Sequence, residues 1–218
     1  GAGSVTPLQM ASAYSVFANG GYRINPWLIT KVTDHKGRVL SETTTPVLEE
    51  QNRAIDARNA FVMNSLLQEV TRSGTAARAQ ATLKRPDLAG KTGTTNDSVD
   101  AWFAGYQPTM AAVTWIGYDT PRNLGSRETG GGLSLPVWIS FMERALKGVP
   151  VSEPKVPTGL VNMGGEWFYE EYARSGVPSV GLEDRNPSAA PATGPAAASA
   201  AQPPVTEERK RILDLFRN

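Results

Sequence analysis

The chain has 218 residues, enough for one sizeable domain, and its 22 Lys and Arg residues nearly balance 21 Asp and Glu residues, leaving a net charge of +1. No dense basic run appears, which argues against nucleic acid as a partner. The absence of cysteine excludes disulfides, thiolate metal sites and thiol nucleophiles, and a single histidine excludes a multi-histidine metal site. We therefore expect neither a metal nor a cofactor.

No segment approaches the roughly 18 consecutive apolar residues of a membrane-spanning helix. The first predicted helix follows residue 1 almost at once, and we expect the chain to be part of a longer protein. Thr6-Pro7-Leu8-Gln9 supplies a capping threonine, a proline at the first helical position and a glutamine three residues after the cap. This pattern predicts a helix that ends at Asn19-Gly20-Gly21 and carries on one face Met10, Tyr14 and Phe17.

Residues 22–40 contain β-branched side chains on both sides of a turn at Asp34–Gly37, which predicts a β-hairpin with His35 in the solvated turn. Apolar side chains recur at helical spacing from Asp56 to Thr71, and Ser73-Gly74 would end that helix.

From residue 88 onward the pattern favours strands. Segments 101–106 and 111–118 are short, aromatic and β-branched, with a turn at Gln107–Thr109, and are typical of an antiparallel pair. A last amphipathic helix would end before Gly148 and is marked by Leu135, Ile139, Met142 and Leu146. Strands followed by a packing helix predict the α+β class.

We divide the chain at residues 150 and 186. Residues 1–150 form the predicted domain, and 151–186 are a C-terminal extension with one local hairpin expected within 161–172. Residues 187–218 are an Ala/Pro-rich tail, in which low apolar content predicts disorder apart from a possible short helix at 206–218.

The stretch AGKTGTTND, residues 89–97, places a lysine among glycines and threonines. A phosphate-binding loop would need glycine at position 85, which is Arg85, and a helix after the lysine, where a turn and a strand are expected. We therefore reject nucleotide binding.

The alternative places Lys91-Thr92-Gly93-Thr94 on an edge strand that faces a cleft. Period-two alternation sends Lys91 and Gly93 to one face and Thr92 and Thr94 to the other, so that strand twist or a local kink must help all of them reach one ligand. An ammonium and hydroxyls form a receptor for a carboxylate, and a strand N–H beside them can stabilise an oxyanion.

Three segments carry a family resemblance: VTPLQMASAYSVFANGGYRINP, RPDLAGKTGTTNDSVDAWFAGYQP and ETGGGLSLPVWISFM. In order and spacing, residues 1–150 resemble the transpeptidase domain of class A penicillin-binding proteins. This resemblance implies the penicillin-binding protein and serine β-lactamase-like fold, an antiparallel sheet packed with helices, of which only the C-terminal portion would be present.

K-T-G is one of three signatures of that superfamily, and the other two, S-x-x-K and S-D-N, have no counterpart in a suitable context. The formal match Ser152-Glu153-Pro154-Lys155 lies after the last predicted helix, in the wrong order. The nucleophilic serine is therefore expected upstream of this chain, and the chain alone is expected to be inactive.

The resemblance implies a peptidoglycan D,D-transpeptidase that cross-links D-Ala-D-Ala stem peptides through a serine acyl-enzyme and is acylated by β-lactams. Lys91 would support the electrostatics of the cleft, Thr92, Gly93 and Thr94 would bind the substrate, and the N–H of Thr94 would donate to the oxyanion. Asp100, Trp102 and Phe103 also match the family pattern, but strand packing accounts for them.

The resemblance further implies an upstream glycosyltransferase domain, a membrane anchor and a location on the periplasmic side of the bacterial inner membrane. The upstream part of the same protein would be the partner that supplies the serine. The alternative is a non-catalytic β-lactam-sensing or scaffold module with the same fold.

Overall fold

The structure is a computed structural model that describes residues 3–126 and 128–173. The predicted tail, 187–218, and the end of the predicted extension lie outside these residues. The first helix, α1 (Pro7–Ala18), begins as the sequence predicts, because the Thr6 side chain accepts from the Gln9 N–H while the Gln9 side chain accepts from the Thr6 N–H. Asn19 ends it.

A three-stranded antiparallel sheet in the order β3-β4-β5 holds the centre of the fold: β3 (Ala89–Thr94), β4 (Ala101–Gln107) and β5 (Met110–Ile116). A short 3-10 turn, η2 (Asn96–Ser98), joins the first two strands. The predicted pair of strands is thus confirmed, and within residues 3–126 and 128–173 β3 has one free edge, since β4 alone pairs with it there.

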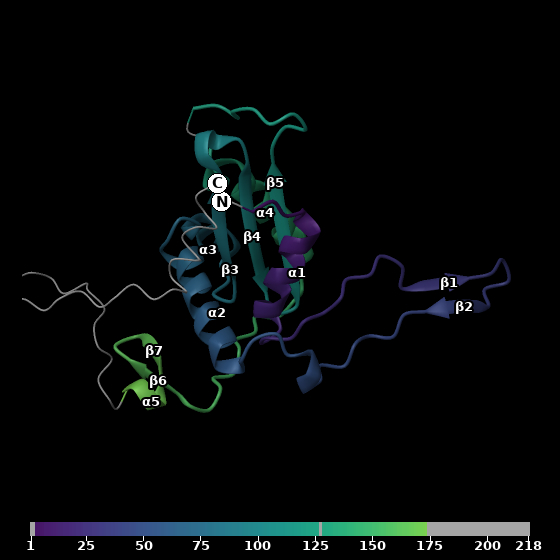
Figure 1. The fold of residues 1–218 in the computed structure, drawn as a ribbon, viewed down its shortest axis with the longest axis horizontal. Coiled ribbons are helices and arrows are strands. Elements are labelled where there is room, and N and C mark those ends of the chain that lie inside the picture. Colours follow the sequence, from purple (N-terminus) through teal and green to yellow (C-terminus); the bar gives the residue numbers. More distant parts are fainter. Residues whose placement is uncertain (1–2, 127, 174–218) are drawn as a thin grey trace, which may run out of the picture. The chain divides into compact units, whose positions relative to one another are not determined.

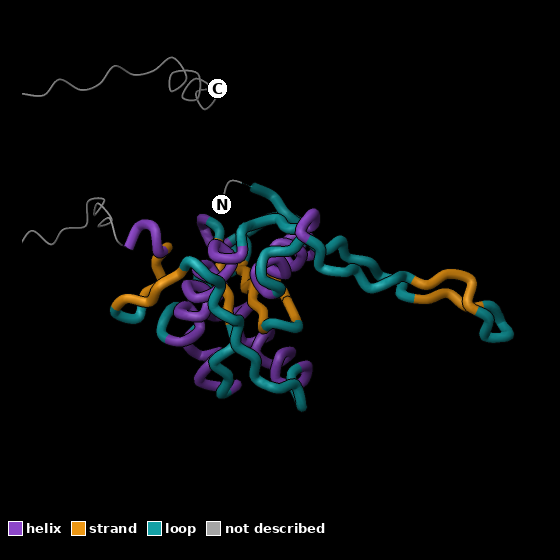
Figure 2. Tube along the Cα trace, turned by 90° about the horizontal axis from the view of Figure 1, so that it is seen from below, coloured by secondary structure: helices purple, strands orange, loops and turns teal. Residues whose placement is uncertain are grey.

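Helices lie on both sides of these strands (Figure 2). On one face, the fully buried Phe103 of β4 packs edge to face on Trp138 of α4 (Leu135–Ala145), with ring centroids 4.9 Å apart. On the other face, Tyr106 contacts Tyr14 of α1, with ring centroids 6.3 Å apart. Alternation of side chains along β4 thus supplies two apolar cores.

The predicted second helix is confirmed as α2 (Ala57–Arg72), which has Asp56 as its N-cap and packs beside β3. The Thr71 hydroxyl donates to the Leu88 carbonyl oxygen at 2.6 Å and so fixes α2 to the start of β3. The elements that the sequence did not predict include the helix α3 (Ala77–Leu83) and a π-helical turn, η3 (Gly130–Ser134), directly before α4.

The predicted hairpin is also confirmed, as β1 (Lys31–Thr33) and β2 (Val39–Glu42), and every residue of both strands is exposed. We call residues 23–52 the arm; it includes the 3-10 turn η1 (Glu50–Asn52) and extends from the rest of the fold (Figure 1). A β-bridge between Tyr22 and Arg53 closes its base, where the Arg53 guanidinium stacks on the Tyr22 ring at 4.2 Å.

After α4, the chain turns back and forms the expected hairpin, β6 (Leu160–Met163) with β7 (Glu166–Tyr169), followed by the short helix α5 (Glu170–Ala173). This hairpin lies beside α2 (Figure 1), where Trp167 packs edge to face on Phe61. A domain boundary at residue 150 stays a prediction.

Candidate active site

The K-T-G tetrad lies on the free edge strand, as predicted. Lys91 pairs with Ala104 of β4 and Thr94 pairs with Ala101, so the tetrad occupies the second half of β3. Because no strand of the described residues lies on the other side of β3, the backbone groups that point away from β4 are open to a ligand.

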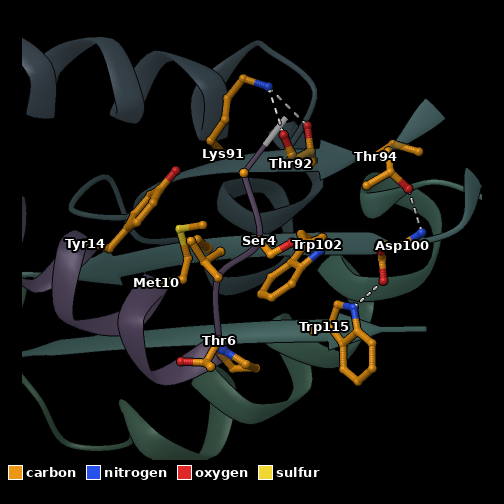
Figure 3. A pocket seen from close by; sticks show the side chains of 16 residues that line it. Ser4, Thr6, Met10, Tyr14, Lys91, Thr92, Thr94, Asp100, Trp102 and Trp115 are labelled. Atoms are coloured by element: carbon orange, nitrogen blue, oxygen red, sulfur yellow. Dashed lines mark hydrogen bonds between the residues drawn. The ribbon is translucent and has the colours of Figure 1, made fainter. Parts of the chain in front are cut away.

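A recess of about 600 Å³ opens beside this strand, between the sheet and the start of α1 (Figure 3). All four residues of the tetrad line it. The opposite wall comes from the segment before α1 and from the helix itself, and the floor comes from β4 and β5, through Ser4, Thr6, Met10, Tyr14, Trp102 and Trp115. The recess therefore joins segments that are about 90 residues apart in the sequence.

The Lys91 ammonium has no carboxylate partner among the described residues. Its Nζ donates to the Thr92 carbonyl oxygen at 3.0 Å and lies 3.5 Å from the Thr92 hydroxyl (Figure 3). A lysine ammonium has three N–H donors, and a carbonyl and a distant hydroxyl leave it open to an anion. The side chain thus bends along the strand toward the threonines, which supplies the convergence that a flat strand would not allow.

The hydroxyls of Thr92 and Thr94 are each oriented by a hydrogen bond to a neighbouring segment. Thr92 Oγ1 lies 2.9 Å from the hydroxyl of Thr75, and Thr94 Oγ1 accepts from the Gly130 N–H at 3.1 Å. A hydroxyl has one donor and two acceptor positions, so the Thr94 O–H remains free to donate after it has accepted from Gly130. The bonds orient both oxygens without using up their capacity for a ligand.

The Thr94 N–H points to the free edge of the sheet. The next residue, Thr95, donates its N–H to the Asp100 carbonyl oxygen across the hairpin at 3.1 Å. Inward and outward N–H groups alternate along an antiparallel strand, so that of Thr94 faces away from β4. An outward N–H beside an ammonium and two hydroxyls is chemically able to stabilise an oxyanion.

Two glycines allow this close packing. A Cβ on Gly93 would lie 3.3 Å from the Trp102 Cβ, which is a tight contact, and a Cβ on Gly130 would lie 2.2 Å from the Trp102 carbonyl oxygen and 2.4 Å from that of Gly93. The η3 turn can therefore rest against β3 only because Gly130 has no side chain.

An indole pair forms the floor of the recess. Trp102 and Trp115 have ring centroids 6.1 Å apart, and Asp100 Oδ1 accepts from the Trp115 indole N–H at 2.7 Å (Figure 3). On the opposite side, burial raises the pKa of the Tyr14 phenol, which stays protonated at neutral pH. Apolar rings thus face the polar tetrad across one space.

The sequence predicted the tetrad but not the rest of this recess. Packing was the expected role of Trp102 and Phe103; Phe103 is indeed fully buried, whereas Trp102 also lines the recess. Ser4, Tyr14 and Trp115 were not predicted as site residues, and no local pattern marks them, because their proximity to Lys91 comes from the packing of α1 on the sheet. Ser152 and Lys155, the formal S-x-x-K match, are not among the lining residues.

Among residues 3–126 and 128–173, no group of three or more His, Cys, Asp or Glu side chains is placed to hold a metal ion. Over the same residues, no helix is both long and apolar enough to cross a bilayer.

Known proteins match this arrangement in sequence and structure. The family described as penicillin binding protein transpeptidase domain matches residues 1–142. Penicillin-binding protein 1A of Neisseria lactamica is 46% identical over 193 residues, which are 88% of this chain and 24% of that protein. Penicillin-binding protein 1A of Pseudomonas aeruginosa is 38% identical, over 84% of this chain and 28% of that protein.

The crystal structure of penicillin-binding protein 1A from Haemophilus influenzae superposes with a TM-score of 0.69 at 32% identity, over 78% of this chain and 32% of that one. The chain thus spans about a quarter to a third of the length of these relatives. The family match covers well over half of the chain, and the predicted resemblance and α+β fold are confirmed. The chain belongs to the penicillin-binding protein transpeptidase family.

Proposed function

We propose that this chain is the part of a peptidoglycan D,D-transpeptidase that carries the K-T-G wall of the active site. The observation that carries the proposal is the recess, in which an unpaired ammonium, two oriented hydroxyls and an outward strand N–H lie side by side on a free edge. Its partners are D-Ala-D-Ala stem peptides and β-lactams, which share a carboxylate next to an acyl group.

In this proposal each group of the tetrad has a role that its geometry supports. Lys91 and the hydroxyls of Thr92 and Thr94 bind the carboxylate through charge-assisted hydrogen bonds. The Thr94 N–H donates to the carbonyl oxygen as the oxygen becomes negative in the tetrahedral intermediate. Gly93 lets the substrate backbone approach the strand, since it has no side chain there.

The nucleophile belongs to the upstream part of the same protein, which also carries the proposed glycosyltransferase domain and membrane anchor. A serine oxygen attacks the carbonyl carbon of the penultimate D-Ala, and the bond to the terminal D-Ala breaks with protonation of its amine. The amine of a second stem peptide then attacks the acyl-serine and restores the serine hydroxyl. We place this reaction on the periplasmic side of the inner membrane, where the cell wall is built.

Acylation by a fluorescent penicillin tests the proposal in the full-length protein. Lys91→Ala removes the cation of the recess, and we expect its acylation rate to fall by about 10²–10³-fold, by analogy with the loss of one oxyanion-hole donor. Lys36→Ala, in the exposed turn of the arm, is the matched control and should label at the wild-type rate. A Lys91→Ala rate within about threefold of wild type contradicts the proposed role.

Two further measurements separate the alternatives. The 218-residue chain alone should form no covalent adduct on a denaturing gel; a saturable band, abolished by Ser4→Ala, would identify a nucleophile in this chain. Full-length protein that is acylated but never joins two stem peptides would be the sensing or scaffold module instead.

A further inference from the structure

A second recess, of about 290 Å³, lies away from the K-T-G tetrad, where the C-terminal extension covers α2. One stripe of α2 forms its floor, because residues three, four and seven apart lie on the same side of a helix. The residues of this stripe are Phe61, Asn64, Ser65, Gln68 and Arg72. Gln80 of α3 also lines the recess, as do Glu153 and Trp167 of the C-terminal extension.

The stripe carries amide and hydroxyl groups without protein partners. Asn64 is only 6% exposed, and its Oδ1 accepts from the Tyr106 hydroxyl at 2.9 Å. Among the described residues, its Nδ2 and the side chains of Ser65, Gln68 and Gln80 make no hydrogen bond to the protein. These atoms are open to solvent, because no buried side-chain N or O atom of the described residues lacks a partner. Polar groups at a concave surface are satisfied by water or by a ligand, so this recess has unused capacity both to donate and to accept.

The charges of the recess argue against an anionic ligand. The Arg72 guanidinium is already paired with Glu69, which also accepts from the Ser73 hydroxyl. Glu153 has no cationic partner among the described residues, so the recess offers no free cation and one free carboxylate. An anion is therefore repelled, whereas hydroxyl groups can donate to this carboxylate.

Two aromatic side chains in contact with each other also line the recess. Phe61 and Trp167 meet edge to face with ring centroids 5.0 Å apart, and both line the recess. Rings beside amides and a carboxylate suit a sugar, whose C–H face packs on an aromatic surface while its hydroxyls bond to the polar groups. An acetamido substituent would pair with the side-chain amides as donor and acceptor.

We propose that this recess is a binding site for an N-acetylated, uncharged saccharide, separate from the K-T-G recess. The identification of the natural ligand as a sugar of the peptidoglycan glycan rests on the proposed function. The inference that the recess binds a saccharide rests only on the residues that line it. Such a site would hold the glycan strand while its stem peptides react elsewhere on the same domain.

Fluorine NMR of the full 218-residue chain, labelled with 5-fluorotryptophan, tests the proposal with a trimer of N-acetylglucosamine. We expect the resonance of Trp167, assigned through Trp167→Phe, to shift saturably, while that of Trp138, fully buried in the core on α4, stays in place as an internal control. No shift at Trp167 overturns the proposal, as does equal binding of a trimer of glucose, which lacks the acetamido groups.

Variants of the half-buried amides locate the site. Gln68→Ala and Gln80→Ala should each weaken the trimer about 2- to 10-fold, the usual effect of one hydrogen bond. Gln51→Ala, on the arm, removes the same group elsewhere and should bind as wild type. Unchanged affinity in both recess variants overturns the proposal. Lys91→Ala leaves this titration unaffected, so failure here and failure of the transpeptidase proposal are distinguishable.

Discussion

Gly130 of η3 packs so closely against the K-T-G strand that a side chain has no room at this position. Its N–H holds the Thr94 hydroxyl, and a Cβ would collide with two carbonyl oxygens on β3 and β4. Since backbone cannot move away as a flexible side chain can, any replacement pushes the η3 turn off the strand. A glycine in a loop thus determines the orientation of a hydroxyl in the candidate site.

We predict that Gly130→Ala lowers the free energy of unfolding by about 1–3 kcal/mol, as overpacking usually does. Chemical denaturation of the full-length protein measures this. Gly132→Ala is the matched control two residues later, where a Cβ would meet its nearest atom at an ordinary 3.4 Å. Equal stability of the two variants would show that η3 adjusts without cost.

The tetrad itself was predictable because its residue types, its flanking turn and its period are local properties. The remaining site residues were not, because Tyr14 and Trp115 reach the recess only through the packing of α1 on β4 and β5. The direction in which the Lys91 side chain bends was equally inaccessible, since it depends on the Thr92 carbonyl and the strand twist.

At the scale of elements, the starts of α1 and α2 were predicted well because their capping side chains, Thr6 and Asp56, are local sequence signals. The helix α3 was not predicted; it begins at Ala77 without a side-chain cap, and Lys84 follows it in a left-handed conformation. Its seven residues have neither a cap signal nor a long apolar period. Only the fully buried Ala76 and Ala79, packed in the α4 core, show why a helix forms there.

The Asp56 carboxylate at the N-cap of α2 makes the stability of the fold depend on pH. Asp56 accepts from the Arg58 N–H at 2.9 Å, and this bond holds the pKa of the Asp56 carboxyl below its ordinary value of 3.8. A depressed pKa stabilises the fold above the unfolded-state pKa, and the contribution is lost as the pH falls through the folded-state pKa.

We therefore predict that Asp56→Ala lowers the free energy of unfolding at pH 7 by about 1 kcal/mol. Asp56→Asn keeps the cap without the charge, so its difference from wild type should shrink as the pH falls below about 4. Thermal unfolding across pH 2–7 measures both. If the difference in stability between wild type and Asp56→Asn stays constant with pH, the proposed lowering of the Asp56 pKa is wrong.

At the scale of the whole molecule, a buried ion pair links two segments that are far apart in the sequence. Asp87, 1% exposed, receives two hydrogen bonds from the Arg85 guanidinium at 2.7 and 2.9 Å and one from the Ser152 N–H. Arg85 also donates to the carbonyl oxygens of Val149 and Pro150. The loop before β3 is thereby fixed to the segment after α4.

We predict that Arg85→Ala costs about 3–5 kcal/mol, because it leaves a buried carboxylate unpaired. Arg58→Ala, which breaks the exposed pairs with Glu171 and Asp56 and the stacking on Tyr169, should cost less, about 1 kcal/mol. Denaturant titrations compare the two. If Arg85→Ala prevents folding, the double variant Arg85→Met/Asp87→Leu should restore it; a double variant no more stable than the single one would contradict this account.

Because contacts close the arm at its base, the arm is a structural insertion whose two ends are held together by the rest of the fold. The chain leaves the body after Tyr22 and returns at Arg53, and the bridge, the stacked guanidinium and a hydrogen bond from Arg53 to the Gly20 carbonyl all lie on the body side. The entropy of closing a loop grows only with the logarithm of its length. Residues between these two points can therefore be shortened, lengthened or replaced by a fluorescent reporter while the K-T-G strand and its recess keep their geometry.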